Sequence, residues 1–224
     1  MSKFIVLEGV GGSGKSTQIE RLKQKYPDAV FVREPGATKA GEEIRELLFA
    51  QAGNLDPVAQ LYLVHAARWQ NVIENIAPAL EAGKIVFCDR FQLSTFAYQV
   101  YLSGRDDVLE HLLETQAQFI SVGINPHYIF LDIPPEESFK RLEGTRNGDT
   151  DSFDQYSMEY QSRIYQGYKQ GIQEMGISYT LIDANQDFDA VSVDVDRAIQ
   201  KELESDKDSE HFGMEGILDD NDED

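Results

Sequence analysis

The stretch Gly9-Val10-Gly11-Gly12-Ser13-Gly14-Lys15-Ser16 decides the fold of this 224-residue chain. It follows an apolar run at residues 4–7, which is typical of a strand buried on both faces of a parallel sheet. A helical pattern begins at Lys15 and continues to about residue 26. A glycine-rich loop that joins a strand to a helix and ends in Gly-Lys-Ser can wrap its backbone N–H groups around nucleotide phosphates. The stretch therefore predicts a phosphate-binding loop, or P-loop.

The residue types in this loop have separate tasks. Lys15 reaches the β and γ phosphates, and the Ser16 hydroxyl can ligate Mg²⁺. We expect ATP and Mg²⁺ as cofactors, with the nucleotide held by Gly9, Val10, Gly11, Gly12, Ser13, Gly14, Lys15, Ser16 and Thr17. A glycine-rich turn without function is the alternative, and the complete match in the correct context argues against it.

The remaining pattern alternates strands with helices. Further strands are expected at residues 29–32, 85–88, 128–131 and 179–182. Helices are expected over residues 42–50, 57–82 with a bend near Pro78, 107–119, 135–142, 158–174 and 189–203. This alternation predicts an α/β P-loop NTPase fold, with a five-stranded parallel sheet flanked by helices. We expect one domain over residues 1–203, with a lid at about 141–154.

A second polar set closes the expected third strand. Asp89 and Arg90 follow Cys88, which places them at the carboxyl end of the sheet, where open α/β folds bind ligands. Asp89 can hold Mg²⁺ through water, and Arg90 can grip an acceptor phosphate with its fork of donors. A surface ion pair at a strand end is the alternative.

The P-loop and the pair Asp89 and Arg90 are compatible with two classes of protein. One is a small-molecule kinase, and the other is a P-loop ATPase or GTPase that acts as a motor, switch or partition factor. The chain has no Asn-Lys-x-Asp guanine motif. The short length and the second phosphate-handling set favour the kinase.

The composition excludes several other classes. Hydrophobic residues at 41% and charged residues at 27% exclude disorder throughout. A net charge of −20 argues against nonspecific binding to nucleic acid. The chain has neither a membrane-spanning window nor a signal-peptide pattern, so we expect a cytoplasmic protein. A single cysteine and four histidines without metal-ligand spacing give neither a disulfide nor a zinc site.

Residues 89–99, Asp-Arg-Phe-Gln-Leu-Ser-Thr-Phe-Ala-Tyr-Gln, resemble the signature of the thymidylate kinase family. The likeness covers residues 3 to about 200 and looks like the bacterial branch. It includes Glu8-Gly9, Ser16-Thr17-Gln18, Arg33-Glu34-Pro35-Gly36, Gly41-Glu42-Glu43-Ile44-Arg45, Ala66-Ala67-Arg68 and Pro78-Ala79-Leu80. The resemblance implies transfer of the γ-phosphoryl group of ATP to dTMP to give dTDP, by a homodimer.

The resemblance also implies an acceptor site. Arg45 and Arg90 would bind the acceptor phosphate, and Tyr98 would fill the space of a ribose 2′-hydroxyl. Arg68, Thr95 and Gln99 would hydrogen-bond the pyrimidine. The expected substrate-binding residues are Glu34, Pro35, Arg45, Val64, Arg68, Arg90, Ser94, Thr95, Tyr98 and Gln99. Solvated positions for Arg45 and Arg68, and a core position for Tyr98, are the alternatives.

The lid needs positive charge to hold the transferring group while water is excluded. Gly12 stands where some family members place an arginine, so this chain resembles those that supply it from the lid. We expect Arg141 and Arg146 in that role; a solvated basic helix face is the alternative. The expected catalytic residues are Lys15, Asp89, Arg90, Arg141 and Arg146.

Three positions depart from the family pattern. Gly11 replaces an acidic residue that contacts the sugar 3′-hydroxyl, and Val64 replaces a phenylalanine that stacks on thymine. Ser152 replaces an arginine after the lid. These departures leave two alternatives open: a kinase with broader or altered specificity, for dUMP or a 5-substituted dUMP, and a noncatalytic P-loop nucleotide-binding protein.

The last segment, residues 204–224, holds ten acidic residues and one lysine. A disordered terminus that aids solubility is one interpretation. The other is a segment that binds a basic partner protein, because residues 211–218 place apolar side chains among the acids.

Overall fold

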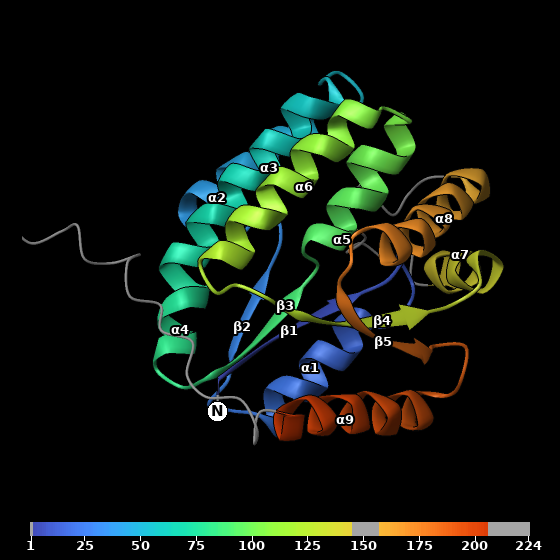
Figure 1. The fold of residues 1–224 in the computed structure, drawn as a ribbon. Coiled ribbons are helices and arrows are strands. Elements are labelled where there is room, and N and C mark those ends of the chain that lie inside the picture. Colours follow the sequence, from blue (N-terminus) through green and yellow to red (C-terminus); the bar gives the residue numbers. More distant parts are fainter. Residues whose placement is uncertain (1, 145–156, 206–224) are drawn as a thin grey trace, which may run out of the picture.

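The computed structural model describes residues 2–144 and 157–205. Within these residues one five-stranded sheet forms the centre of the fold (Figure 1). Its strands are β1 (Lys3–Glu8), β2 (Val30–Arg33), β3 (Ile85–Asp89), β4 (His127–Asp132) and β5 (Ser178–Asp183). The order across the sheet is β2-β3-β1-β4-β5, and every neighbouring pair is parallel. The predicted α/β fold is confirmed.

Helices cover both faces of this sheet. Figure 1 shows α1 and α9 on one face, and α3, α5, α6 and α8 on the other. The helical elements are α1 (Lys15–Lys25), α2 (Lys39–Ala50), α3 (Pro57–Asn71), η1 (Val72–Ile76), α4 (Ala77–Glu81), α5 (Gln92–Thr95), η2 (Phe96–Tyr101), α6 (Asp106–Ser121), α7 (Pro135–Gly144), α8 (Met158–Glu174) and α9 (Phe188–Glu204).

The position of a strand in the sheet explains its sequence. β1 is the central strand, and its side chains from Phe4 to Glu8 are all buried. A strand with helices on both faces needs apolar residues at every position, which is why β1 reads as a continuous apolar run. β5 is an edge strand, and Tyr179 and Leu181 on it are about half exposed.

The helix expected over residues 57–82 is present but is not one regular helix. It contains a π turn, η1, between α3 and α4. Pro78 lies just after that turn; it has no N–H to donate, and its ring would clash with the carbonyl four residues earlier in a regular helix. The wider turn accommodates this proline without ending the helix.

Residues 92–101 form a helical segment that the sequence pattern does not predict. It consists of α5 followed by the π-helical η2. Nearly every side chain in the segment is buried, because it packs between α6 and α8 as well as against α3. A helix that is buried all round has no polar face, so the apolar periodicity that marks other helices is missing.

Candidate active site

The P-loop lies between the carboxyl end of β1 and the first turn of α1. Gly9 and Gly12 both have positive φ, at 149° and 72°. A Cβ on Gly9 would lie 2.8 Å from the Leu131 carbonyl oxygen, and one on Gly12 would lie 2.6 Å from the Ser138 carbonyl oxygen. Backbone occupies both spaces, so neither position accepts a side chain, and an arginine at position 12 would not fit.

The loop residues expected to bind the nucleotide lie in two environments. The Lys15 ammonium is buried and donates to the carbonyls of Gly9 and Val10 at 2.8 and 3.1 Å. Ser16 and Thr17 are exposed on the first turn of α1. The Val10 side chain is part of the core, so only its backbone can face a phosphate. The loop thus presents backbone N–H groups and one ammonium.

A pocket beside the loop brings together the two residues expected to hold a metal. Ser16 and Asp89 both line it, between α1, β2 and β3. Asp89 Oδ1 is buried and has no hydrogen-bond partner among the described residues. A hydroxyl and a free carboxylate oxygen suit Mg²⁺, which keeps several waters and takes one or two protein ligands together with substrate phosphates.

A second pocket, partly open to solvent, includes Arg90 in its wall. All ten residues that the sequence analysis proposed for the acceptor line it, from Glu34 to Gln99. Leu48 and Phe91 complete its wall. The structure brings this set together, and the contact that each residue makes with an acceptor stays a prediction.

Arg68 is fixed at the bottom of this pocket. Its side chain is 2% exposed, so a solvated position is wrong. Its Nε donates to Glu34 Oε2 at 2.5 Å, and its Nη2 donates to Thr95 Oγ1 at 3.0 Å. Burial raises the pKa of Glu34, while the charge of Arg68 and a hydrogen bond from Asn71 act in the opposite direction. The result is a guanidinium held in one orientation.

Arg45 is also buried rather than solvated, at 8% exposure. Its Nη1 donates to the Pro35 carbonyl at 3.0 Å, and its guanidinium lies 4.5 Å from the centre of the Phe49 ring. Tyr98 is half-buried and lines the pocket, so it is not an ordinary core residue.

Arg90 connects the P-loop backbone with the acceptor pocket. Its Nη1 donates to Tyr168 Oη at 2.6 Å and contacts Ser94 Oγ and the Gly9 carbonyl, each at 3.3 Å. One guanidinium therefore contacts the P-loop backbone and lines the acceptor pocket. This inward position does not fit a surface ion pair at the strand end.

The structure describes only one of the two arginines expected in the lid. Arg141 is on α7, and its Nη2 donates to the Ala184 carbonyl at 3.0 Å. Arg146, most of the expected lid and Ser152 lie outside the described residues, as does the tail from residue 206. The catalytic roles of Arg141 and Arg146 remain predictions.

Four side chains that shape the site have no role in the sequence analysis. Tyr168 accepts a hydrogen bond from Arg90, and Glu8 accepts one from Ser94. Asn71 donates to Glu34, and Ser138 Oγ donates to the Gly11 carbonyl at 2.6 Å. Glu8 had one signal in the sequence, because a glutamate that closes a buried strand is expected to be buried itself, and buried carboxylates are rare. The other three lie on helices, where nothing in the local sequence indicates a long-range contact.

A P-loop that shares an arginine with a second, arginine-lined pocket defines a kinase for small phosphorylated acceptors. Comparison with known proteins gives the particular family, because a family model described as thymidylate kinase matches residues 7–195. The chain belongs to the thymidylate kinase family. It is an ATP-dependent phosphotransferase, and the alternative of a motor, switch or partition factor is wrong.

Individual relatives agree with this assignment. The chain is 36% identical over 207 residues to a thymidylate kinase of Thermoanaerobacter sp. (strain X514), which covers 90% of this chain and 98% of the relative. It is 41% identical over 170 residues to one of Kosmotoga olearia, covering 74% and 79%. The crystal structure of thymidylate kinase from Ehrlichia chaffeensis superposes with a TM-score of 0.65 at 30% identity, covering 89% and 98%. Among the described residues no helix is long and apolar enough to cross a membrane.

Proposed function

We propose that this chain transfers the γ-phosphoryl group of ATP to dTMP, giving dTDP and ADP. The observation that carries the proposal is the position of Arg90, which contacts the Gly9 carbonyl of the P-loop at 3.3 Å while it lines the acceptor pocket. A cation there lies between donor and acceptor. It would neutralise charge on both phosphates as the phosphoryl group passes between them.

Catalysis in this scheme is positioning and charge stabilisation. The P-loop N–H groups hold the ATP phosphates, and Lys15 leaves its own loop carbonyls to reach the β and γ phosphates. Arg45 and Arg90 hold the acceptor phosphate in line with the γ phosphate. Arg141 and Arg146 are the lid residues proposed to add positive charge when the site is closed.

The proposal includes Mg²⁺ at Ser16 and Asp89. Ser16 and Asp89 would hold the cation there, and it would offset the negative charge of the phosphate groups. The free oxygen of Asp89 and its shared pocket with Ser16 support this assignment.

The orientation of Arg68 supports a pyrimidine with a carbonyl at position 4. A guanidinium can only donate hydrogen bonds, and Glu34 and Thr95 already use two of its N–H groups. Thymine and uracil present an acceptor to the remaining donors, whereas cytosine presents an amino group, which is another donor. A buried donor without an acceptor is costly, so dCMP should be rejected.

A second candidate, broader tolerance at the 5 position of the base, is favoured by the pocket wall. Val64, at the position where an aromatic stack would be expected, lines the pocket, and the aliphatic Leu48 lines it too. We expect this wall to admit dUMP with a larger 5-substituent.

A panel of deoxynucleoside monophosphates assayed with ATP and Mg²⁺ tests both candidates. We expect transfer to dTMP, to dUMP and to 5-substituted dUMP, with dCMP at least about a hundredfold poorer in kcat/KM. A preference of about a thousandfold for dTMP over every other acceptor would rule out broad tolerance. If ADP forms at the same rate without any acceptor, or never forms, the kinase proposal fails.

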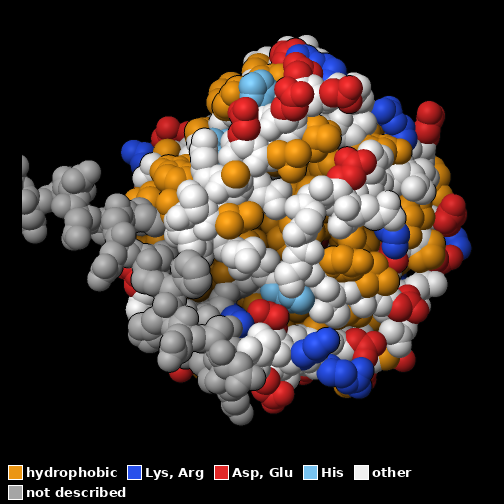
Figure 2. Space-filling model, viewed as in Figure 1, with side chains coloured by type: hydrophobic (Ala, Val, Ile, Leu, Met, Phe, Trp, Pro, Cys, Tyr) orange, Lys and Arg blue, Asp and Glu red, His pale blue; other side chains and the backbone are white. Residues whose placement is uncertain are grey.

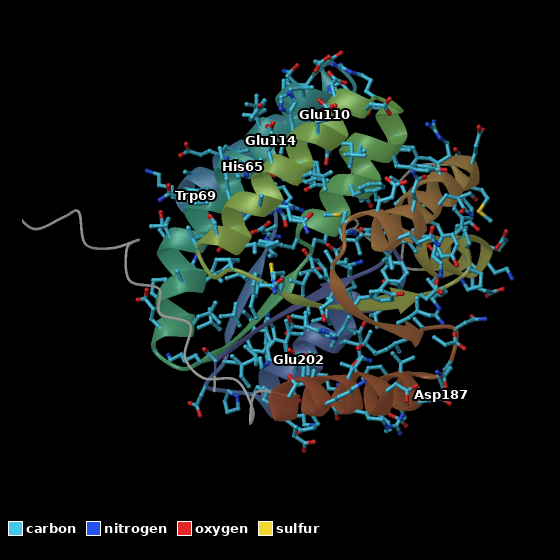
Figure 3. The ribbon with its side chains drawn as sticks, in the orientation of Figure 1. His65, Trp69, Glu110, Glu114, Asp187 and Glu202 are labelled. Atoms are coloured by element: carbon cyan, nitrogen blue, oxygen red, sulfur yellow. The ribbon has the colours of Figure 1, made fainter. Side chains whose placement is uncertain are left out.

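We also propose that the protein is a homodimer that associates through α2, α3 and α6. Four large apolar side chains are exposed on these helices: Leu47 at 44%, Tyr62 at 48%, Leu113 at 40% and Ile120 at 50%. Figure 2 shows hydrophobic and acidic side chains mixed over this region, and Figure 3 places His65 and Trp69 along α3 beside Glu110 and Glu114 of α6. Exposed apolar side chains interspersed with polar residues are typical of a non-obligate protein interface.

A further inference from the structure

Glu8 is the last residue of β1, and no expected role in the reaction accounts for it. Its side chain is completely buried. Three donors converge on its carboxylate: the Phe91 N–H at 2.7 Å, the Ser94 N–H at 3.1 Å and the Ser94 hydroxyl at 2.7 Å. All three come from residues within four positions after Arg90 in the chain.

The backbone at Arg90 needs this support. Arg90 has φ of 71°, in the left-handed region that side chains other than glycine adopt at some energetic cost. The N–H of the next residue, Phe91, is one of the donors to Glu8. The carboxylate on β1 therefore holds the chain in the conformation in which Arg90 contacts the P-loop backbone and lines the acceptor pocket.

A chain of hydrogen bonds then continues from Glu8 to the arginine side chain. Ser94 Oγ lies 2.7 Å from Tyr168 Oη, and Tyr168 Oη accepts from Arg90 Nη1 at 2.6 Å. A carboxylate can only accept, so the Ser94 proton points to Glu8. Ser94 Oγ is then free to accept from Tyr168, and Tyr168 Oη is free to accept from Arg90. The buried carboxylate fixes the direction of every bond in the series.

We propose that Glu8 is a positioning residue for the reaction, which holds the Arg90 guanidinium in place through Ser94 and Tyr168. The proposal rests on the proposed function only in assigning the acceptor phosphate to Arg90. Its new content is that the acceptor-binding geometry is set by a carboxylate of β1 and a tyrosine of α8, neither of which faces the acceptor.

A purely structural role for Glu8 would require its charge to stabilise the folded protein. Burial raises the pKa of this carboxyl, against the opposing charge of Arg90, so the ionised group is not favourable for stability on its own account. A neutral residue of the same shape should then preserve or increase stability. Positioning instead requires the charge, because only the carboxylate orders the direction of the bonds.

Glu8→Gln separates the two roles. Its amide oxygen can keep both backbone N–H bonds, which turns the NH₂ group toward Ser94. Ser94 must then donate to Tyr168, whose own proton loses its acceptor, and the bond to Arg90 weakens. We expect the KM for dTMP to rise about tenfold or more, with the KM for ATP changed by less than about twofold and the melting temperature at pH 8 unchanged or higher.

Tyr168→Phe removes the hydroxyl that Arg90 contacts and should give the same pattern. The double variant should be no worse than the poorer single variant, because both act through one arginine. Tyr165→Phe is the matched control: Tyr165 is one turn away on α8, and its hydroxyl interacts with Asp132 instead. We expect the control to retain the wild-type KM for dTMP.

The guanidinium NMR signals of Arg90 in the substrate-free protein, assigned by their loss in Arg90→Lys, provide a readout that does not depend on activity. We expect them to shift or broaden in Glu8→Gln and Tyr168→Phe and to stay unchanged in Tyr165→Phe. Unchanged signals in both Glu8→Gln and Tyr168→Phe would overturn the proposal. Altered signals with an unchanged KM for dTMP would support the positioning by Glu8 and instead contradict the assignment of the acceptor phosphate to Arg90.

Discussion

At the scale of single residues, the ion pair between Arg68 and Glu34 makes a prediction about stability. Both side chains are at most 2% exposed. Arg68→Met would leave a buried carboxylate without its cation, and we expect the free energy of unfolding to fall by about 3–5 kcal/mol. The double variant Glu34→Gln/Arg68→Met should recover most of this loss, because neither charge of the buried pair remains.

Urea unfolding at pH 7 measures these differences, with Arg105→Met as the control. Arg105 pairs with Asp56 and Asp107, but its side chain is 40% exposed. Its removal should change the unfolding free energy by less than about 1 kcal/mol. Equal losses in Arg68→Met and Arg105→Met would mean that the buried ion pair contributes no more to stability than an exposed one.

Val64 makes a residue-scale prediction about the base. It lies on α3, one turn before Arg68, and lines the acceptor pocket. In Val64→Phe an aromatic ring could stack on the base, which is worth about 0.5–1.5 kcal/mol. We expect the KM for dTMP to fall by up to about tenfold, and turnover of bulky 5-substituted analogues to be lost.

Steady-state kinetics with dTMP and a 5-substituted dUMP check this expectation. Val193→Phe, at an exposed position on α9, should leave both acceptors unaffected. A Val64→Phe variant that binds dTMP more weakly, yet still accepts the bulky analogue, would show that Val64 does not face the base.

At the scale of elements, the P-loop depends on α7. The Gly12 position has positive φ, and a Cβ there would lie 2.6 Å from the backbone carbonyl of Ser138. Gly12→Ala should therefore displace the loop from α7 and raise the KM for ATP more than the KM for dTMP. We also expect a loss of about 1–3 kcal/mol in unfolding free energy.

Gly83→Ala is the matched control for this variant. Gly83 has nearly the same φ, 73°, but a Cβ there meets no atom within 4 Å. It carries the backbone strain without the clash and lies far along the chain from the P-loop. Equal KM values for ATP in the two variants would show that contact with α7 does not shape the nucleotide site.

The elements also show what the sequence can predict. Strands such as β1 and amphipathic helices such as α8 follow from local patterns, and the predicted bounds of α8 agree with the structure, Met158–Glu174. The segment α5–η2 could not be predicted, because burial on every side removes its polar face. Start positions also shift where a cap decides them: α2 begins at Lys39, after Thr38 Oγ1 accepts from the Gly41 N–H.

The candidate site also contains residues that the sequence reveals and residues that it does not. Residues proposed to contact phosphates, such as Lys15 and Arg90, belong to short motifs and can be found from spacing and residue type. Glu8 and Tyr168 act through the packing of β1 and α8 against α5, and are 160 positions apart in the chain. Long-range hydrogen bonds of that kind leave no local pattern.

At the scale of the whole molecule, stability should depend on pH through His127. This side chain joins β4 to β5 through Ser178 and Thr180 and lies 3.5 Å from Glu202 of α9. Burial lowers its pKa below the ordinary 6.5, although Glu202 acts in the opposite direction. The unfolded chain therefore takes up this proton at a higher pH than the folded protein does.

The stabilising contribution of neutral His127 is complete above pH 6.5 and is lost as the pH falls through the lower, folded pKa. His127→Gln can keep the hydrogen bonds but does not titrate. Measured by urea unfolding from about pH 8 to about pH 5, the advantage of the wild type over this variant should shrink on acidification. An advantage that grows instead would mean that the pair with Glu202 outweighs burial.

The last prediction concerns assembly. If the exposed surface of α2, α3 and α6 is the dimer interface, a charge at Leu113 should separate the subunits, because a buried unpaired carboxylate is strongly unfavourable. Light scattering should give a dimer mass for the wild type and a monomer mass for Leu113→Glu at the same concentration.

Leu181→Glu is the matched control, since Leu181 is 47% exposed, close to the 40% of Leu113, but lies on β5 at the far edge of the sheet. The control should remain a dimer. Dissociation by Leu181→Glu alone would place the interface at β5, and a monomeric wild type would exclude the homodimer.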